Sequence, residues 1–204
     1  MKFVVAIDGT AASGKGTLGK KIAEHFDFHY LDTGILYRVV AFSLQYDSDL
    51  SKISAQKVQN ALNLLTNKNF NITSLRNEKI TQKASEISKN KIVRDSLLSY
   101  QRDFAFQNGG SVLDGRDIGT VVCPDADVKI FVDADVKIRA KRRYDQLFIN
   151  SKDLHLKNIL NDLSKRDDLD TNREFSPMVP AKDAFLLDTS NLTVEEALKK
   201  IIVI

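Results

Sequence analysis

The feature of this sequence that most constrains its fold is a glycine-rich loop between an apolar strand and an amphipathic helix. The loop, residues 8–17, reads Asp-Gly-Thr-Ala-Ala-Ser-Gly-Lys-Gly-Thr. Residues 3–7 before it are an apolar run typical of a buried strand, and after it apolar residues recur at helical spacing through Phe26. This order of strand, glycine-rich turn and helix predicts a loop that surrounds a phosphate group.

The composition of the loop indicates how it would hold phosphate. Gly9 and Gly14 allow backbone conformations that are closed to residues with a Cβ, so successive N–H groups can turn inward around phosphate oxygens. The next helix points its positive end at the same anion. Lys15 can reach the β- and γ-phosphates, and Thr17 offers a hydroxyl to Mg2+ or phosphate. The residues predicted to bind nucleotide here are Gly9, Thr10, Ala11, Ala12, Ser13, Gly14, Lys15, Gly16 and Thr17.

One residue of the loop departs from the general Walker A pattern. Gly16 stands where that pattern has Ser or Thr. A metal contact would therefore move to Thr17 or Ser13. The alternative interpretation is a glycine-rich turn that only joins a strand to a helix, but the correct flanks on both sides favour nucleotide binding.

Length and composition fit a compact enzyme. A chain of 204 residues with 43% hydrophobic content can bury one good core, which predicts one main domain with an insert. The net charge of +3 comes without a long basic run interleaved with aromatics, which excludes a nucleic-acid partner. The single Cys123 excludes an internal disulfide and fits a reducing cytoplasm. We also expect no signal peptide and no membrane span, because strand residues begin almost at once and no apolar run approaches about 20 residues.

Apolar strands alternate with helices along most of the chain. Strands are predicted at 3–8, 29–32, 111–114, 128–133 and 184–188, and helices at 14–25, 36–46, 135–150, 155–170 and 194–202. Thr193 and Glu196 have the spacing of a capping box for the last helix. The alternation predicts an α/β fold with a parallel sheet covered by helices on both faces. Residues 50–90 break it with a polar helix at 50–69, a small strand at 70–73 and the start of a broken helix at 78–106, so this stretch looks inserted.

Polar residues follow several of the predicted strands. Ligands of parallel sheets bind beyond the carboxyl ends of the strands, so Asp8, Asp32, Asp114 and Asp133 should meet at one edge. After the strand at 111–114 come Arg116, whose guanidinium can bind phosphate, and Asp117, which can accept from a sugar or base. A plain Arg–Asp surface pair is the alternative. Asp114 fits equally a partner for hydrated Mg2+ and a cap of its own loop.

Further arginines lie on two predicted helices. Arg139, Arg142 and Arg143 share one helix face, and Arg166, Asp170 and Arg173 follow at i, i+4 and i+7. Charged helix faces are often only solvated. Phosphoryl transfer to an acceptor that is already an anion, however, needs positive charge and no general base, so the pattern favours a kinase. The histidines at 25, 29 and 155 have no metal-ligand spacing.

These motifs together resemble those of the bacterial cytidylate kinases, in the nucleoside monophosphate kinase family of P-loop kinases. The resemblance spans nearly all 204 residues and rests on the segments 8–9 with 14–17, 31–34 with 37–38, 114–122, 129–131 and 165–173. It implies a P-loop three-layer α/β/α fold with an acceptor-binding insert and a helical lid. The implied core is about 1–49, 107–138 and 171–204, with the insert at about 50–106 and the lid at about 139–170.

The resemblance also implies a reaction and its residues. The reaction is transfer of the γ-phosphoryl group of ATP to CMP or dCMP with Mg2+, by a cytoplasmic monomer. Catalytic roles fall to Lys15, Arg116 and Arg173, ATP binding to residues 9–17 with Arg142 and Arg143 of the lid, and a metal contact to Thr17. The implied CMP-binding residues are Thr33, Tyr37, Arg38, Ser85, Arg94, Arg116, Asp117, Arg166, Asp170 and Arg173. Among these Arg38, Arg116 and Arg173 would bind the acceptor phosphate. Arg166 and Asp170 would hold the sugar. The residues that would recognise cytosine are Ser85, Arg94 and Asp117.

The chain departs from the family pattern in three places. Thr10 replaces a Pro, Thr33 replaces a Ser, and between Phe70 and Leu75 most of a β-hairpin is missing. The alternatives are a kinase with a relaxed or different acceptor (UMP and CMP, AMP, or a small acceptor such as shikimate), and a P-loop switch without an acceptor. A switch of the GTPase type should carry an Asn-Lys-x-Asp segment after a strand, and this sequence has none.

Overall fold

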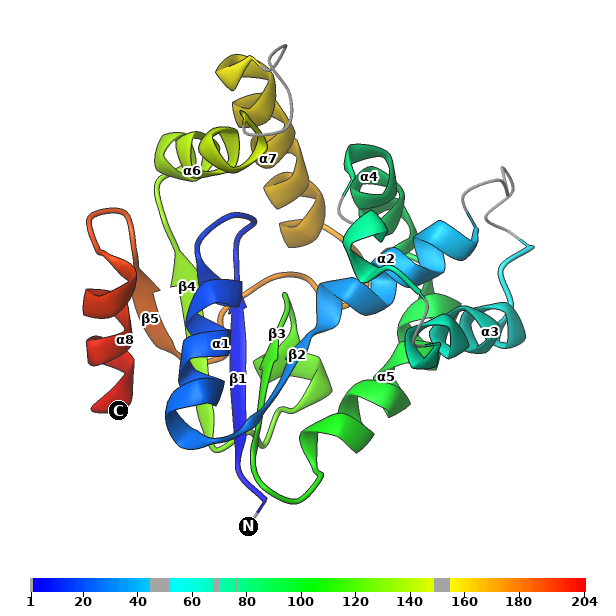
Figure 1. Ribbon diagram of the computed structural model, residues 1–204, viewed down its shortest axis with the longest axis horizontal. Helices are drawn as coiled ribbons and strands as arrows, with labels where there is room; N and C mark the ends of the chain where they lie inside the picture. Colours follow the sequence, from blue (N-terminus) through cyan, green and yellow to red (C-terminus); the bar gives the residue numbers. More distant parts are fainter. Residues whose placement is uncertain (1, 45–51, 68–69, 76, 149–154) are drawn as a thin grey trace. The chain divides into compact units, whose positions relative to one another are not determined.

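The order of strands and helices follows the predicted alternation (Figure 1). A computed structural model describes residues 2–44, 52–67, 70–75, 77–148 and 155–204. The elements are β1 (Val4–Gly9), α1 (Lys15–Phe26), β2 (His29–Asp32), α2 (Thr33–Ser43), α3 (Ala55–Thr66), α4 (Glu78–Ile87), α5 (Lys91–Ala105), β3 (Ser111–Asp114), β4 (Val128–Asp133), α6 (Val136–Phe148), α7 (Leu156–Thr171), β5 (Phe185–Asp188) and α8 (Val194–Ile202). Short 3-10 and π-helical turns lie at Ile72–Leu75 and Ile118–Val122.

The strands form one five-stranded sheet in the order β2-β3-β1-β4-β5. β1 pairs in parallel with both β3 and β4, and β4 pairs in parallel with β5. Ile7 of β1 lies opposite Asp114 of β3 and Ile130 of β4. The predicted α/β fold with a parallel sheet flanked by helices is therefore confirmed, and the carboxyl ends of these strands meet at one edge.

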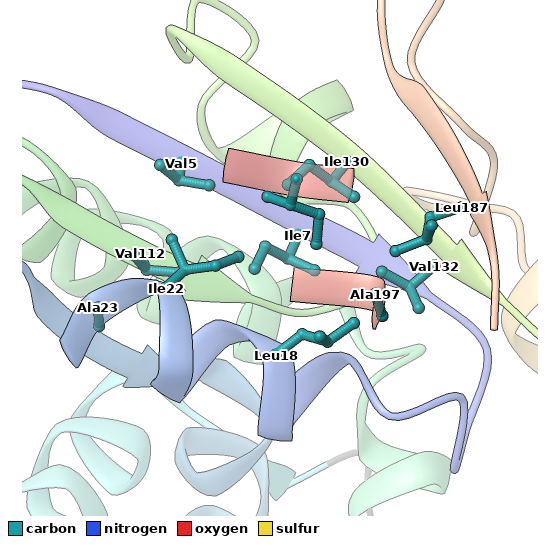
Figure 2. Close-up of a cluster of buried hydrophobic side chains, with 11 residues drawn as sticks. Val5, Ile7, Leu18, Ile22, Ala23, Val112, Ile130, Val132, Leu187 and Ala197 are labelled. Atoms are coloured by element: carbon teal, nitrogen blue, oxygen red, sulfur yellow. The ribbon is translucent and has the colours of Figure 1, made fainter. Parts of the chain in front are cut away.

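The core of the sheet lies between β1 and the helices α1 and α8 (Figure 2). Val5 and Ile7 occupy alternate positions of β1, and their side chains point toward this side. Leu18 and Ile22 of α1 face them. Ile7, Leu18 and Ile22 are almost fully buried. Each such side chain contributes about 2 kcal/mol of hydrophobic free energy on folding. This packing holds the first turn of α1 at the carboxyl end of β1, where the glycine-rich loop lies.

The predicted capping box begins the last helix. Thr193 accepts from the backbone N–H of Glu196, and the Glu196 carboxylate accepts from the backbone N–H of Thr193. Two N–H groups that a helix start leaves unpaired are thereby satisfied. The cap fixes where α8 starts, and α8 packs against α1.

The chain divides into two compact units. One consists of Met1–Leu31 with Ala105–Ile204, and the other is Asp32–Phe104. In the second unit α2 packs against α3 and α4, with Leu36 and Val39 fully buried. The predicted insert, about 50–106, falls in this second unit except for its last two residues.

Three local predictions differ from the structure. The strand at 70–73 was wrong, because Asn71 starts a 3-10 turn instead: its side chain accepts from the backbone N–H and the hydroxyl of Thr73, and its carbonyl accepts from Ser74. α2 begins at Thr33 and not at Leu36. The helix predicted at 50–69 is also shorter in the structure, since α3 begins after Ser54 and ends before Asn67. The ends of the helices predicted at 36–46 and 135–150 fall partly outside the described residues.

No helix in the described part of the chain is long and apolar enough to cross a membrane.

Candidate active site

Two glycines give the phosphate loop (residues 9–17) its course. Gly9 has φ +144°, and a Cβ there would lie 1.9 Å from the carbonyl oxygen of Val132. Only glycine therefore allows β1 to approach β4 so closely at this point. Gly14 has φ +94° and stands directly before the first residue of α1. The loop thus turns from strand to helix through a left-handed residue, which directs the start of α1 toward the edge of the sheet.

Lys15 and Ser13 donate inside the loop to the same carbonyl. The Nζ of Lys15 lies 3.2 Å from the oxygen of Thr10, and the Oγ of Ser13 lies 3.0 Å from it. Both side chains are buried, whereas Thr17 is exposed. Ser13 therefore uses its hydroxyl to close the loop, and Thr17 presents its hydroxyl at the surface.

Side chains from the ends of β4 and β5 anchor the loop. The hydroxyl of Thr10 donates to Asp133 at 2.6 Å. The hydroxyl of Thr189, which follows β5, donates to the carbonyl oxygen of Ser13 at 2.8 Å. Arg142 of α6 donates in turn to the carbonyl and hydroxyl oxygens of Thr189, at 2.7 and 3.1 Å. Arg143, the other predicted ATP-binding arginine, is half-buried on the same helix.

A partly buried ion pair ties the loop to α6 and α7, which pack against each other. Arg139 of α6 donates to Asp167 of α7 at 2.6 Å and to the carbonyl oxygen of Ala11 at 3.1 Å. The N–H of Ala11 points at the same carboxylate, 3.4 Å away. Both polar groups of one loop residue are therefore held by two helices of the predicted lid.

Arginines and aspartates gather in a second place in the same unit. We call Arg116, Asp117, Arg166, Asp170 and Arg173 the arginine–aspartate cluster. Arg116 donates to Asp170 at 2.8 Å, and Arg173 and Arg166 lie 3.8 and 4.0 Å from the same carboxylate. Arg173 also lies 3.5 Å from Asp117 and donates to the carbonyl oxygen of Ser176. Side chains predicted from two separate motifs thus come together.

The cluster carries more positive than negative charge. Burial alone would raise the pKa of Asp170, but the guanidinium groups of Arg116, Arg166 and Arg173 outweigh it and hold that pKa below its ordinary value. Burial alone would lower the pKa of Arg116, and Asp170 outweighs it and raises that pKa. The shifts of Arg116 and Asp170 both favour their charged forms, and three guanidinium groups against two carboxylates favour a phosphate here.

Asp8 lies at the end of β1 beside the phosphate loop. Its carboxylate is 4% exposed and accepts from the backbone N–H groups of Ile118 and Gly119 at 2.7 and 2.8 Å. Burial raises its pKa to about 7, although the two N–H groups oppose the shift. Asp117 adds to the rise and Arg116 reduces it.

The remaining predicted CMP-binding residues lie in the unit Asp32–Phe104. On α2, Thr33 is buried and Arg38 forms an ion pair with Asp32 at 3.4 Å. Arg94 of α5 lies over the ring of Tyr37, 5.8 Å from its centroid. The Oγ of Ser85 on α4 is buried without a hydrogen-bond partner among the described residues. A buried hydroxyl in this state is a candidate to contact a ligand.

Asp114 lies beside Gly16, the position at which the Walker A pattern has the hydroxyl of a Ser or Thr. A Cβ added to Gly16 would come within 3.0 Å of Asp114 Oδ2, and this carboxylate accepts from the hydroxyl of Tyr30 at 2.7 Å. The structure thus gives a steric reason for glycine at position 16. No group of three or more His, Cys, Asp or Glu side chains within the described residues could hold a metal ion alone.

Two residues that anchor the loop were missed from the sequence. Thr189 follows β5 at the carboxyl edge of the sheet, so the rule that selected Asp114 and Asp133 could have found it. Asp167 gives no such signal, because it stands among charged residues of a charged helix.

A phosphate loop on a parallel sheet, in one unit with a net-positive arginine–aspartate cluster, defines a P-loop phosphotransferase. Comparison with known proteins specifies the family. A family model described as cytidylate kinase matches residues 5–204. The chain therefore belongs to the cytidylate kinase family, a family of nucleotide phosphotransferases that implies nucleotide substrates, with ATP as co-substrate.

Curated relatives agree with this assignment along nearly the whole chain. The cytidylate kinase of Bartonella henselae is 48% identical over 196 residues, covering 95% of this chain and 89% of that protein. The cytidylate kinase of Nitrobacter winogradskyi is 46% identical over 202 residues, covering 99% and 95%.

Solved structures are similar in fold. A crystal structure of an uncharacterized protein from Eubacterium ventriosum matches with a TM-score of 0.56 at 16% identity, covering 98% of this chain and 96% of that one. A gluconokinase from Sinorhizobium meliloti matches with a TM-score of 0.50 at 12% identity, covering 99% and 90%. At such identities the likeness concerns the fold alone.

Proposed function

We propose that this protein catalyses the reaction named by its family, the transfer of the γ-phosphoryl group of ATP to CMP and dCMP. An oxygen of the acceptor phosphate attacks the γ-phosphorus, the bond to the β-phosphate oxygen breaks, and ADP leaves. The observation that supports the proposal is that one unit holds both the phosphate loop, with Lys15 directed into it, and the arginine–aspartate cluster. Neither needs a general base, because the acceptor is already ionised.

The phosphate loop is the donor site in this proposal. Its backbone N–H groups and the start of α1 bind the phosphates of ATP, and Lys15 neutralises charge on the β- and γ-phosphates. Lys15 is already directed into the loop, where it contacts the carbonyl oxygen of Thr10. Arg142 and Arg143 would add charge from α6. The ties from Arg139 and Asp167 to Ala11 support this, because they link the lid helices to the loop.

The arginine–aspartate cluster is the acceptor site in this proposal. Arg116 and Arg173 bind the phosphate of CMP, while Asp170 and Arg166 contact the sugar hydroxyls. The support is geometric, since Asp170 already orients Arg116 through a 2.8 Å hydrogen bond. A guanidinium held in this way loses little further entropy when it binds phosphate. On this basis Lys15, Arg116 and Arg173 are the catalytic residues, because they would stabilise charge on the transferred group.

The unit Asp32–Phe104 supplies the remaining acceptor contacts in this proposal. Of this unit, Ser85 and Arg94 read cytosine, a role that the family pattern also gives to Asp117, while Arg38 contacts the phosphate and Thr33 and Tyr37 line the pocket. The buried Ser85 hydroxyl without a partner supports a hydrogen bond to the base. Arg94 is held by Tyr37 and by the carbonyl oxygen of Ser88, which supports a fixed role.

Mg2+ fits the residues around Gly16. Mg2+ prefers oxygen ligands and is usually held by one or two protein groups together with substrate phosphates. Asp114 and Thr17 would hold it here, since Asp114 lies beside the position of the usual hydroxyl and Thr17 is the next residue. When bound, the ion neutralises charge on the phosphates. The monomeric state and the cytoplasmic location stay predictions.

An acceptor panel tests the proposed function. ADP release is measured with ATP, Mg2+ and each of CMP, dCMP, UMP, AMP and GMP. We expect kcat/KM for CMP and dCMP to exceed the values for the other three. Equal kcat/KM for UMP would keep the phosphotransfer and overturn the base-reading role of Ser85, Arg94 and Asp117. No transfer to any acceptor would overturn the reaction itself and favour a P-loop switch.

A further inference from the structure

The carboxylate of Asp8 joins two loops that are far apart in sequence. It stands at the end of β1, directly before Gly9 of the phosphate loop. Its two oxygens accept from the N–H groups of Ile118 and Gly119, the first two residues of the π-helical turn Ile118–Val122. The side chain therefore crosses from the phosphate loop to the segment that carries Arg116 and Asp117.

The turn needs this partner because its own residues do not cap it. Asp117 precedes the turn, and its side chain makes no capping hydrogen bond. Within the turn, the N–H of Val122 donates to the carbonyl oxygen of Asp117, and the N–H of Cys123 donates to that of Ile118. The N–H groups of the first residues therefore point away from the turn. Asp8 satisfies two of these N–H groups from another strand, and the Asp117 carboxylate is thereby available to Arg173.

The position of the turn determines where the arginine–aspartate cluster forms. Gly115 is held by the carbonyl oxygen of Ile7, and Ile118 by the side chain of Asp8. Arg116 and Asp117 lie between these two fixed points. Their contacts with Asp170 and Arg173 depend on this short segment keeping its place.

We propose that Asp8 is a positioning residue for the phosphate acceptor, which sets the places of Arg116 and Asp117 by holding the N–H groups of Ile118 and Gly119. This inference rests on the proposed acceptor role of the cluster. Because Asp8 adjoins Gly9, one carboxylate then fixes the distance between the donor loop and the acceptor residues. That distance controls in-line transfer, where small misplacements lower the rate strongly.

The burial of the Asp8 carboxylate indicates a functional role, because a buried charged group is not the choice that gives the highest stability. A buried carboxylate costs free energy that an apolar side chain in the same place would not. Burial raises the pKa of Asp8 for the same reason. Buried carboxylates of this kind are concentrated at functional sites. Here the carboxylate accepts two charge-assisted hydrogen bonds from one turn.

Asp8→Asn tests the inference with little change of volume. An amide has one acceptor oxygen, so one of the two N–H groups would face an N–H donor. We expect KM for CMP to rise about 10-fold or more, in line with loss of one charge-assisted hydrogen bond. The Kd for a nonhydrolysable ATP analogue should stay within about 2-fold, because the loop keeps its own anchors. Equal weakening of both ligands would make Asp8 a purely structural residue and overturn the inference, as would no change in either.

Asp127→Asn is the matched control. Asp127 also accepts a backbone N–H of β1, that of Val4 at 2.8 Å, but at the opposite end of the strand. This variant removes the negative charge from a similar bond without touching either anion site, so KM for CMP and Kd for the ATP analogue should both stay as in the wild type. A rise in KM for CMP as large as in Asp8→Asn would contradict the proposed link.

A measurement on the wild type covers the case in which Asp8→Asn does not fold. Hydrogen exchange followed by NMR at pH 7.5 should show slow exchange of the Ile118 and Gly119 amides. Fast exchange of both would overturn the inference without any variant. Failure of the proposed function is distinguishable, because it would be seen as absent CMP turnover in the wild type itself.

Discussion

The phosphate loop and the arginine–aspartate cluster are built for anions in opposite ways. The loop is one contiguous segment whose proposed anion-binding groups are mostly backbone N–H groups, with Lys15 as its charge. The cluster takes side chains from the loop after β3, from α7 and from Arg173 beyond it. A backbone site depends on a few glycines and their conformation, whereas a side-chain site depends on each partner holding the next.

The charges of the two sites differ in the same way. In the cluster each of the three guanidinium groups lies within 4.0 Å of Asp170, so a bound phosphate has to share arginines that already have anionic partners. In the loop the Nζ of Lys15 contacts a neutral oxygen, the carbonyl oxygen of Thr10. Removing one residue should therefore have a local effect in the loop and a wider one in the cluster.

The largest effect is expected from Lys15→Ala. Loss of the cation on the β- and γ-phosphates should lower kcat/KM by about 1000-fold, as for removal of a strong transition-state donor. The melting temperature should change little, since Ser13 still donates to the carbonyl oxygen of Thr10. The ADP-release assay and thermal unfolding measure the two quantities. A collapse in melting temperature would contradict the placement of Lys15.

Lys21→Ala is the control for that variant. Lys21 lies on the same helix and forms a surface ion pair with Glu195 at 3.8 Å. Its loss should leave kcat/KM unchanged.

Arg173→Ala comes next and should separate the two substrates. We expect kcat/KM for CMP to fall about 100-fold, with little change in ATP affinity, because two charge-assisted contacts to phosphate would be lost. The melting temperature should also fall, since Asp117 and Asp170 both lose a partner in a buried place. Steady-state kinetics in each substrate and thermal unfolding are the measurements. Arg102→Ala, at an exposed arginine, is the control, and a drop in ATP affinity with unchanged CMP kinetics would reverse the assignment.

A smaller effect is expected from Asp167→Asn, which tests whether the loop depends only on its backbone. Loss of the negative charge weakens the bond from Arg139 and the hold on Ala11. We expect KM for ATP to rise about 5-fold and KM for CMP to stay unchanged, as for about 1 kcal/mol of lost positioning. Asp168→Asn, at the exposed neighbour, is the matched control. An unchanged KM for ATP would show that the loop needs no help from the lid helices.

The last expected effect concerns stability against pH and not catalysis. The pKa of Asp8 rises from 3.8 to about 7 on folding, so between these values the folded protein holds a proton that the unfolded chain has released. The stability from this group is thus present below pH 3.8 and is lost as pH rises toward 7. The loss is about 1.4 kcal/mol per pH unit, or roughly 3 °C in melting temperature. Thermal unfolding between pH 5.5 and 7 should show this slope in the wild type and not in Asp8→Asn, and equal slopes in both would refute it.

The sequence predicted the loop better than the cluster for a physical reason. Gly9, Gly14 and Lys15 lie within seven residues, and their local conformation decides the structure. The strands at 29–32, 111–114 and 128–133 also agree with β2, β3 and β4, because apolar runs followed by polar residues mark strand ends. For the cluster, the sequence indicated only that Arg166, Asp170 and Arg173 share one helix face. The place of Arg116 rested on the expectation that the carboxyl ends of the strands converge.

The wrong and missed predictions concern places where side-chain hydrogen bonds determine the backbone conformation. The alternating residues 70–73 suggested a strand, but Asn71 folds back on Thr73 and Ser74. The π-helical turn at Ile118–Val122 has no local signal, because its partner Asp8 lies 110 residues earlier. The hold of Arg139 and Asp167 on Ala11 likewise joins segments distant in sequence. Such contacts appear only once the sheet has brought the strand ends together.

Crossed binding measurements test the separation of the two sites most directly. Isothermal titration of a nonhydrolysable ATP analogue and of CMP is carried out on the wild type, on Lys15→Ala and on Arg173→Ala. The account predicts that Lys15→Ala loses ATP affinity by about 10-fold or more and keeps its CMP affinity, and that Arg173→Ala does the reverse. If each variant weakened both ligands alike, the loop and the cluster would not be separate donor and acceptor sites, and the account would be wrong.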